Sequence, residues 1–196
     1  MLKKRKQQPF FYLASQSPRR RHLLKRAGFS FQICSTTFKE KQWRGLSPRQ
    51  FALRNAAGKA KNAKIQNISC WVLGADTVVA CQNKILGKPR SITQAKQCLK
   101  FLSGKTHRVY TAIVFYQQKS KRLYQKCICT QVRFKKLSHD QIQKVVQKTN
   151  PLDKAAGYAI QTQGKDLVAS IKGPYTNVIG LPIQDVRRMI HQISKK

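Results

Sequence analysis

Trp71-Val-Leu-Gly-Ala-Asp-Thr-Val-Val-Ala80 is the most apolar run of the chain, and it carries one carboxylate, Asp76, in its middle. Its length and composition are typical of a buried strand or a pair of strands. Burying a carboxylate without a partner costs on the order of several kcal/mol. Asp76 therefore either faces a cleft, where it can do chemistry, or is a structural carboxylate bonded to the backbone or to one of the many cations.

The segments on either side of this run alternate between strand and helix patterns. Ser17 and Pro18 suit an N-cap and a first helical position, Gly28 suits a helix end, and Ser138 with Gln141 forms a capping-box pattern. Strands are expected at 10–14, 31–34, 71–80, 84–86, 109–116, 123–134 and 167–171, and helices at 18–27, 48–67, 92–102, 138–148 and 181–194. No internal repeat or linker divides the chain, so the sequence predicts one α/β domain over residues 1–196.

Composition predicts a folded chain that attracts polyanions. Hydrophobic residues make up 41% of the 196, with aromatic residues along the whole length, which argues against disorder. Forty Lys and Arg against six Asp and Glu give a formal net charge of +34, which attracts nucleic acid, an anionic membrane or a phosphate-rich small molecule. Because the basic residues are scattered along the chain, a general basic bias explains them as well as a binding surface does.

Cysteine usage predicts a cytoplasmic protein. The six cysteines, at positions 34, 70, 81, 98, 127 and 129, form no Cys-x-x-Cys pair, zinc spacing or compact disulfide framework, so we expect reduced thiols. The basic N-terminal segment is followed by too short an apolar stretch for a signal peptide. No membrane span is expected either, because no stretch approaches the roughly 20 apolar residues that a span needs.

The first candidate site is Ser15-Gln-Ser-Pro-Arg-Arg20, at the start of the helix expected over 18–27. Arg19 and Arg20 in a first turn oppose the helix dipole, which favours negative charge there, and a bound anion would reverse that penalty. The turn amides, the hydroxyls of Ser15 and Ser17 and the two guanidinium groups together suit a phosphate. The alternative is two solvated surface arginines. The chain has no P-loop and no dinucleotide fingerprint.

The second candidate is Lys59, which shares one face of its predicted helix with Ala52, Ala56 and Ala63. A lysine in a stripe of small apolar residues points toward the sheet, where it needs an anionic partner. The alternative is a side chain that bends outward, so that its ammonium group reaches water.

The third candidate joins Asp76 and Thr77 with Lys88. If residues 81–84 form a hairpin turn, Lys88 returns close to Asp76. A carboxylate among cations can hold a divalent metal or activate a water for attack on a phosphoryl group. The alternative is a structural ion pair.

Seven motifs, in order, resemble the Maf family of nucleotide pyrophosphatases. They are Leu13-Ala-Ser-Gln-Ser-Pro-Arg-Arg20, Gly74-Ala-Asp-Thr-Val-Val79, Leu86-Gly-Lys-Pro89, Ser103-Gly-Lys-Thr-His107, Pro151-Leu-Asp-Lys-Ala155, Gly157-Tyr-Ala-Ile-Gln161 and Val178-Ile-Gly-Leu-Pro182. Each motif is weak alone, but together they span nearly the entire chain.

The resemblance implies hydrolysis of a nucleoside triphosphate to its monophosphate and pyrophosphate, with a divalent cation such as Mg, Mn or Co as cofactor. It also implies an elongated two-lobed α/β fold, a twisted mixed β-sheet flanked by helices, with the active site in the cleft between the lobes. On matching positions, Asp76 resembles the catalytic proton acceptor and, with Glu40, a metal ligand. The substrate-binding residues implied are Ser15, Arg19, Arg20, Glu40, Lys59, Thr77, Lys88 and Gln161. Of these, Arg19, Thr77 and Gln161 match the branch that acts on dTTP and UTP, so these and related or modified pyrimidine nucleotides are the expected substrates.

The chain departs from the family pattern at three places. Gly58 stands where the family has an acidic residue before the helix lysine, Asn150 stands where an acid usually precedes Pro-Leu-Asp, and residues 155–157 read Ala-Ala-Gly in a rearranged order. These changes leave the number of metal ligands and the substrate preference open. A basic nucleic-acid-binding protein and a regulator of cell division that binds nucleotide without turnover are the competing functions, and a homodimer is compatible with each.

Overall fold

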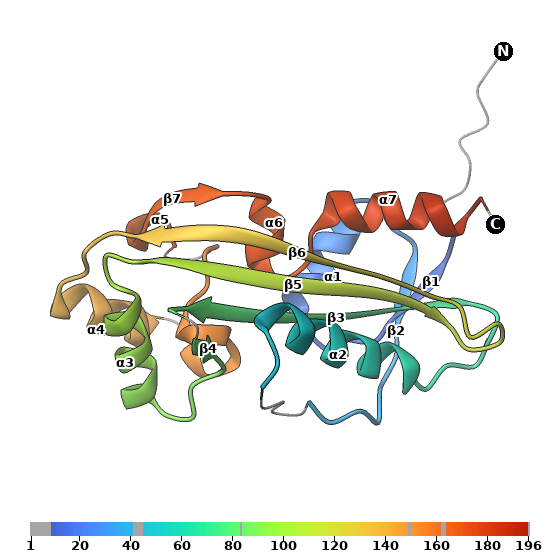
Figure 1. Ribbon diagram of the computed structural model, residues 1–196, viewed down its shortest axis with the longest axis horizontal. Coiled ribbons are helices and arrows are strands. Elements are labelled where there is room, and N and C mark those ends of the chain that lie inside the picture. The colour runs from blue at the N-terminus through green and yellow to red at the C-terminus, as the bar shows by residue number, and fades with distance from the viewer. Residues whose placement is uncertain (1–8, 41–44, 83, 149, 162–163, 196) are drawn as a thin grey trace, which may run out of the picture.

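The computed structural model describes residues 9–40, 45–82, 84–148, 150–161 and 164–195 (Figure 1). Within these ranges the chain forms an open seven-stranded mixed sheet of order β2-β1-β3-β5-β6-β7, with β4 paired to β3. The strands are β1 (Phe11–Leu13), β2 (Phe31–Ile33), β3 (Trp71–Cys81), β4 (Lys84–Leu86), β5 (Thr106–Gln117), β6 (Leu123–Phe134) and β7 (Val168–Lys172). The predicted α/β class with a mixed sheet is confirmed.

The apolar run is a single strand, β3, and it links the two parts of the sheet. Its first residues pair in parallel with β1, and its last residues pair antiparallel with β4, with Val79 opposite Leu86. Along nearly its whole length β3 also pairs antiparallel with β5, which continues into the long β5–β6 hairpin. This hairpin follows the long axis of the molecule, which makes the fold elongated (Figure 1).

Helices cover both faces of the sheet. They are α1 (Pro18–Arg26), α2 (Pro48–Lys61), α3 (Ile92–Leu102), α4 (His139–Lys148), α5 (Gly164–Leu167), α6 (Tyr175–Ile179) and α7 (Ile183–Ile193), with 3₁₀ turns η1 (Pro151–Asp153) and η2 (Ala155–Gly157). Strand side chains alternate between two cores. Leu73 and Ile113 lie in the core with α1 and α7, whereas Val72 and Val114 lie in the core with α2. No described helix has the length and apolarity of a membrane span.

One predicted boundary is wrong. α2 ends at Lys61 rather than near residue 67, because the chain turns there to pair with the segment after β2. The Asn62 side chain donates to the Gly58 carbonyl, and the Asn62 carbonyl accepts a hydrogen bond from the Thr37 amide. The local bond from Asn62 to Gly58 and the long-range bond from Thr37 replace the next helical turn.

The remaining boundaries agree to within about two residues, apart from the extension of β5 at its start. The capping box before α4 is confirmed, since Ser138 and Gln141 exchange side-chain to backbone hydrogen bonds. Ser17 is the N-cap of α1, but its hydroxyl accepts no bond from the helix. The short elements α5, α6, η1 and η2 were not predicted, because each is too short to show a period. Asn83, in the predicted turn before β4, lies outside the described residues.

Candidate active site

A cleft of about 1190 Å³ opens between the β1–α1 turn and α2 on one side and the segments around β4 and η2 on the other, with the middle of β3 at its floor. Eight of the nine residues singled out in the sequence line it: Ser15, Arg19, Arg20, Glu40, Lys59, Asp76, Thr77 and Lys88. Gln161 is the exception, because its side chain is exposed and is not among the lining residues.

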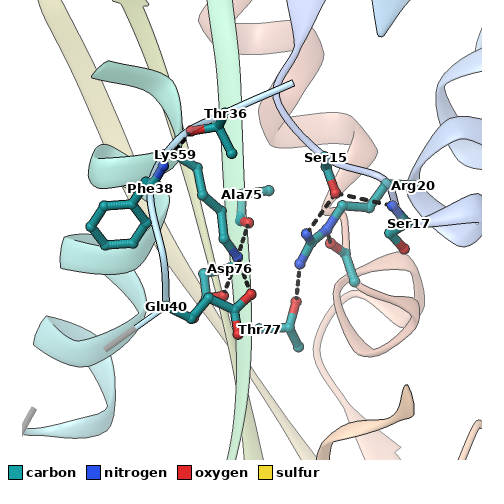
Figure 2. A network of polar contacts seen from close by, with 11 residues as sticks. Ser15, Ser17, Arg20, Thr36, Phe38, Glu40, Lys59, Ala75, Asp76 and Thr77 are labelled. Atoms are coloured by element: carbon teal, nitrogen blue, oxygen red, sulfur yellow. Dashed lines mark hydrogen bonds and ion pairs between the residues drawn. The ribbon is translucent and has the colours of Figure 1, made fainter. Parts of the chain in front are cut away.

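Lys59 lies at the centre of the charged part of the cleft (Figure 2). Its Nζ lies 2.7 Å from Asp76 Oδ1 and 2.7 Å from Glu40 Oε1, and it donates to the Ala75 carbonyl at 3.3 Å. The Lys59 and Asp76 side chains are only 10% and 8% exposed, whereas Glu40 is half exposed. The buried orientation of Lys59 is therefore the one adopted, and Asp76 is an ion-paired carboxylate that also faces the cleft.

Gly74 explains how α2 brings Lys59 onto β3. A Cβ atom at Gly74 would lie 2.2 Å from the Ala56 carbonyl oxygen and 2.9 Å from the Ala60 amide nitrogen. The absence of a side chain there, with alanines facing it, lets the helix backbone approach the strand closely. Lys59 precedes Ala60 and Asp76 lies two residues after Gly74, so this close contact brings the Lys59 side chain to Asp76.

Phe38 and Gly58 hold the segment that carries Glu40. A Cβ atom at Gly58 would lie 2.3 Å from Phe38 Cε2, so the Phe38 ring occupies the space that any larger residue would need. The Phe38 amide donates to Thr36 Oγ1, and the Thr36 hydroxyl donates to the Asn62 carbonyl at the end of α2. Glycine at position 58, where the family has an acidic residue, thus leaves the space that the Phe38 ring fills.

The basic side chains of the cleft favour the binding of anions. Burial raises the pKa of the Glu40 carboxyl, but Lys59, Lys88 and Arg20 outweigh burial and leave this pKa below its ordinary value. Lys88 itself is exposed at the cleft, where the β3–β4 hairpin returns it. A ligand that carries several negative charges would find Lys88 and the arginines around one opening.

Arg20 is held firmly although it stands in a first helical turn. Its Nε donates to the Gly180 carbonyl at 2.9 Å, Nη1 to Ser15 Oγ at 3.1 Å and Nη2 to Thr77 Oγ1 at 3.1 Å (Figure 2). Burial lowers the pKa of Arg20, and the carboxylates of Asp76 and Glu40 oppose that effect. Arg20 is therefore a buried, oriented cation, which excludes the alternative of a solvated surface arginine.

Arg19 lies at the rim beside the 150–154 segment. Its Nη1 and Nη2 contact Asp153 at 3.5 Å, and Lys154 contacts the other carboxylate oxygen of Asp153 at 2.6 Å. Burial raises the pKa of Asp153, but Lys154 and Arg19 together leave it lowered. Lys154 Nζ also donates to the backbone carbonyl of Asn150. Asn150 is one of the three departures from the family pattern, and this contact does not depend on its side chain.

Several lining residues were not singled out in the sequence, and two of them, Asn55 and Tyr158, are buried side chains that carry polar groups. Asn55 is 1% exposed and lies one helical turn before Lys59 on the same face of α2, so its position in the alanine stripe was the available signal. Tyr158 is 6% exposed, and its hydroxyl lies 2.7 Å from His107 Nε2. Tyr158 stands within a quoted motif and Asn55 on the helix of Lys59, but only the fold brings them to the same cleft.

The carboxylate pair is compatible with a divalent metal. Both the Asp76 and Glu40 oxygens lie 2.7 Å from the same Lys59 nitrogen, so they are separated by no more than twice that distance. Carboxylate oxygens suit Mg²⁺ and Mn²⁺, which commonly take one or two protein carboxylates together with substrate phosphates. Among the described residues no cluster of three or more His, Cys, Asp or Glu could hold an ion by itself. The donor set therefore fits a metal that is completed by phosphate oxygens.

Comparison with known proteins gives a consistent result. The family model described as "Maf-like protein" matches residues 10–193. A protein of Geobacter sulfurreducens named dTTP/UTP pyrophosphatase is 40% identical over 181 residues, which cover 90% of this chain and 95% of the relative. Proteins with the same name are 42% identical in Moorella thermoacetica (91% of this chain, 92% of the relative) and 40% identical in Bacillus pumilus (91% and 93%).

Proposed function

This chain belongs to the Maf-like protein family, and from that membership we propose that it hydrolyses dTTP and UTP to the monophosphate and pyrophosphate. The observation that carries the proposal is the Asp76–Lys59–Glu40 cluster beside Arg20, inside a cleft of about 1190 Å³. The cleft is large for a small-molecule site, where volumes of roughly 300–1000 Å³ are usual. It combines one buried carboxylate with cations on several sides, as attack on a polyphosphate requires.

In the proposed mechanism, Asp76 accepts a proton from a water molecule as the water oxygen bonds to the α-phosphorus. The bond from the α-phosphorus to the oxygen that bridges to the β-phosphorus then breaks, and pyrophosphate leaves with the electron pair. Lys59 holds the Asp76 carboxylate in place through the contact at 2.7 Å. Arg20, Arg19 and Lys88 bind phosphate oxygens and offset the charge that develops on the leaving pyrophosphate.

The metal requirement is part of the proposal. Asp76 and Glu40 would hold the divalent cation, Mg²⁺, Mn²⁺ or Co²⁺, whose chemistry is to neutralise charge on phosphate oxygens. Lys59 contacts both carboxylates, so the same residue would also limit how far the two ligands can separate.

The preference for pyrimidine nucleotides is proposed from Arg19, Thr77 and Gln161. Arg19 and Thr77 line the cleft, which supports their assignment. The exposed Gln161 follows the lining residue Ala159 by two positions. We propose that Gln161 meets the nucleotide at the edge of the cleft.

The cytoplasm is the proposed location. All six cysteines fall within the described ranges and none forms a disulfide, which supports a reducing compartment. Burial raises the pKa of the Cys34 and Cys127 thiols to about 11, so these two stay protonated and unreactive.

The decisive experiment measures pyrophosphate release from standard and modified nucleotides with Mg²⁺, Mn²⁺ or Co²⁺. We expect dTTP and UTP to be the best standard substrates, and Asp76→Asn to lower kcat by about a hundredfold or more, as loss of a general base does. Asp140→Asn is the matched control, because Asp140 is an exposed carboxylate on α4. Near-wild-type release by a folded Asp76→Asn variant would remove Asp76 from the mechanism, and no release from any nucleotide would refute the activity.

A further inference from the structure

A chain of hydrogen bonds, part-buried at the cleft and fully buried beyond it, runs from Arg20 through the sheet to α6. Arg20 Nη2 donates to Thr77 Oγ1, which lies 3.0 Å from Thr111 Oγ1, and Thr111 donates to the Asn177 carbonyl at 2.9 Å. Thr77 and Thr111 are directly opposite each other on β3 and β5. Thr111 and Asn177 are fully buried, and neither lines the cleft.

The direction of each bond in this chain follows from its members. A carbonyl oxygen can only accept, so the single hydroxyl hydrogen of Thr111 is committed to Asn177. Thr77 must then donate its own hydroxyl hydrogen to Thr111, which leaves the Thr77 oxygen to accept from Arg20. Thr111, which is two hydrogen bonds away from Arg20, thus determines that Thr77 presents an acceptor to Arg20.

Asn177 is anchored independently of Arg20. Its Nδ2 donates to the Val109 carbonyl at 3.0 Å and to Thr130 Oγ1 at 3.1 Å, and the Thr130 hydroxyl donates to the Pro174 carbonyl at 3.0 Å. Because both partners of the Asn177 amide can only accept here, the orientation of that amide is determined. The side chain of Asn177 therefore ties α6 to β5 and β6, and the backbone carbonyl of the same residue is the acceptor to which Thr111 donates.

α6 thus acts on Arg20 at two points. Gly180, just after α6, accepts directly from Arg20 Nε, and Asn177 within α6 acts through Thr111 and Thr77. With the bond from Nη1 to Ser15, three of the five N–H groups of the guanidinium have partners among the described residues. One N–H on each terminal nitrogen remains for a ligand in the cleft.

We propose that Thr111 is a positioning residue that orients the Arg20 guanidinium for phosphate, acting through Thr77. The proposal rests on the proposed function, since it assigns Arg20 to the phosphates of the substrate. Thr111 itself does not line the cleft, so it acts on the substrate only through Thr77 and Arg20. Its hydroxyl determines which way the Thr77 hydroxyl points, and so whether Arg20 Nη2 finds an acceptor or a competing hydrogen.

The test compares two buried threonines that differ in one respect. Thr111→Val and Thr130→Val each replace a fully buried hydroxyl with a methyl group of similar shape and each break two hydrogen bonds. Only Thr111→Val removes a member of the chain to Arg20, because Thr130→Val leaves every bond of that chain, and the Asn177 bond to Val109, in place. Affinity for inorganic pyrophosphate by calorimetry and kcat/KM for dTTP and UTP are measured for both. Thr111→Ser, which keeps the hydroxyl, is the conservative variant, and Thr111→Ala replaces Thr111→Val if the valine variant does not fold.

We expect Thr111→Val to weaken pyrophosphate binding and kcat/KM by about tenfold, the usual effect of losing a hydrogen bond to a charged group. Thr130→Val should stay within about twofold of wild type although its melting temperature falls as much, and Thr111→Ser should restore most of the affinity. In an Arg20→Ala background, Thr111→Val should add nothing further.

Equal effects of Thr111→Val and Thr130→Val, or no recovery in Thr111→Ser, would overturn the positioning role while leaving the activity intact. A wild-type protein that binds pyrophosphate but releases none from any nucleotide would refute the proposed function, and the affinities of the variants would still decide the role of Thr111. A wild-type protein that neither binds pyrophosphate nor releases it from any nucleotide would overturn both, and in an active protein that binds pyrophosphate too weakly to measure, kcat/KM of the variants decides the role of Thr111.

Discussion

Lys59 is the residue on which the charged cluster depends, because one ammonium group contacts both carboxylates of the cleft. Removing one member of a buried ion pair leaves the other charge uncompensated, which usually costs more than the intact pair contributes. Loss of Lys59 affects Asp76 more than Glu40, because the Asp76 side chain is only 8% exposed whereas Glu40 is half exposed and reaches water. The stability of the site is therefore concentrated in the Lys59–Asp76 contact.

We expect Lys59→Met to lower the free energy of unfolding by about 3 kcal/mol, because Asp76 then lies buried without its cation. The double variant Lys59→Met/Asp76→Asn should be more stable than Lys59→Met alone, since the unpaired charge is gone. Urea unfolding measures both. A double variant less stable than Lys59→Met would show that the two residues do not form an energetically coupled pair.

His107 gives a second prediction, on pH. Burial lowers the pKa of His107 from 6.5 to about 4, so the folded protein holds the ring neutral where the unfolded chain protonates it. The stabilising contribution is full above pH 6.5 and is lost as the pH falls toward 4, amounting to about 3 kcal/mol over that range. His107→Phe/Tyr158→Phe, which removes both partners of the 2.7 Å contact, should lose less stability than wild type between these pH values.

Chemical denaturation at pH 7, 6, 5 and 4 measures this difference. Glu40 and Asp153 have lowered pKa values and also lose stabilisation at acidic pH, but they are present in both proteins and cancel in the comparison. Identical pH profiles for the two proteins would refute the assignment to His107.

At the scale of elements, the contact between α2 and β3 decides whether the site forms. Gly74 permits this contact, and Gly58 permits Phe38 to pack over α2 on the way to Glu40. Neither glycine has a positive φ, so both are required for space rather than for backbone conformation. The sequence shows the helix and the strand, but only their close approach joins Lys59 to Asp76.

Gly74→Ala should destabilise the protein by about 2 kcal/mol or more, because the new methyl group meets helix backbone that cannot move aside without separating α2 from β3. Gly87→Ala is the matched control, since a Cβ atom at Gly87 meets nothing within 4 Å and its φ is not positive. Thermal unfolding of the two variants measures the difference. Equal melting temperatures would contradict the role given to Gly74.

At the scale of the whole molecule, the formal net charge of +34 acts on stability as well as on ligands. Like charges repel over roughly a Debye length, about 8 Å at physiological salt, and the compact state brings them closer than the unfolded state does. The few ion pairs described involve carboxylates from a set of only six. The surface therefore lacks the mixture of signs that usually offsets such repulsion.

We expect the melting temperature to rise by several degrees between about 20 mM and 300 mM NaCl, because salt screens this repulsion. KCl at the same ionic strength should act alike, since screening does not depend on which monovalent salt is used. A melting temperature that falls with salt would mean that attractive pairs, rather than net repulsion, dominate the electrostatic energy.

The sequence by itself determined the order of the long elements, the capping box of α4, the Asp76 strand and the motifs of the family, because each depends on residues a few positions apart. Eight of the nine candidate residues also line the cleft as the motifs suggested. Only the tertiary structure decided that one lysine joins Asp76 and Glu40, that Phe38 fills the place above Gly58, and that Gln161 lies outside the cleft lining. The physical reason is that these contacts depend on close packing between distant segments, as in the bond from Arg20 to Gly180 across 160 residues, and no local pattern specifies that packing.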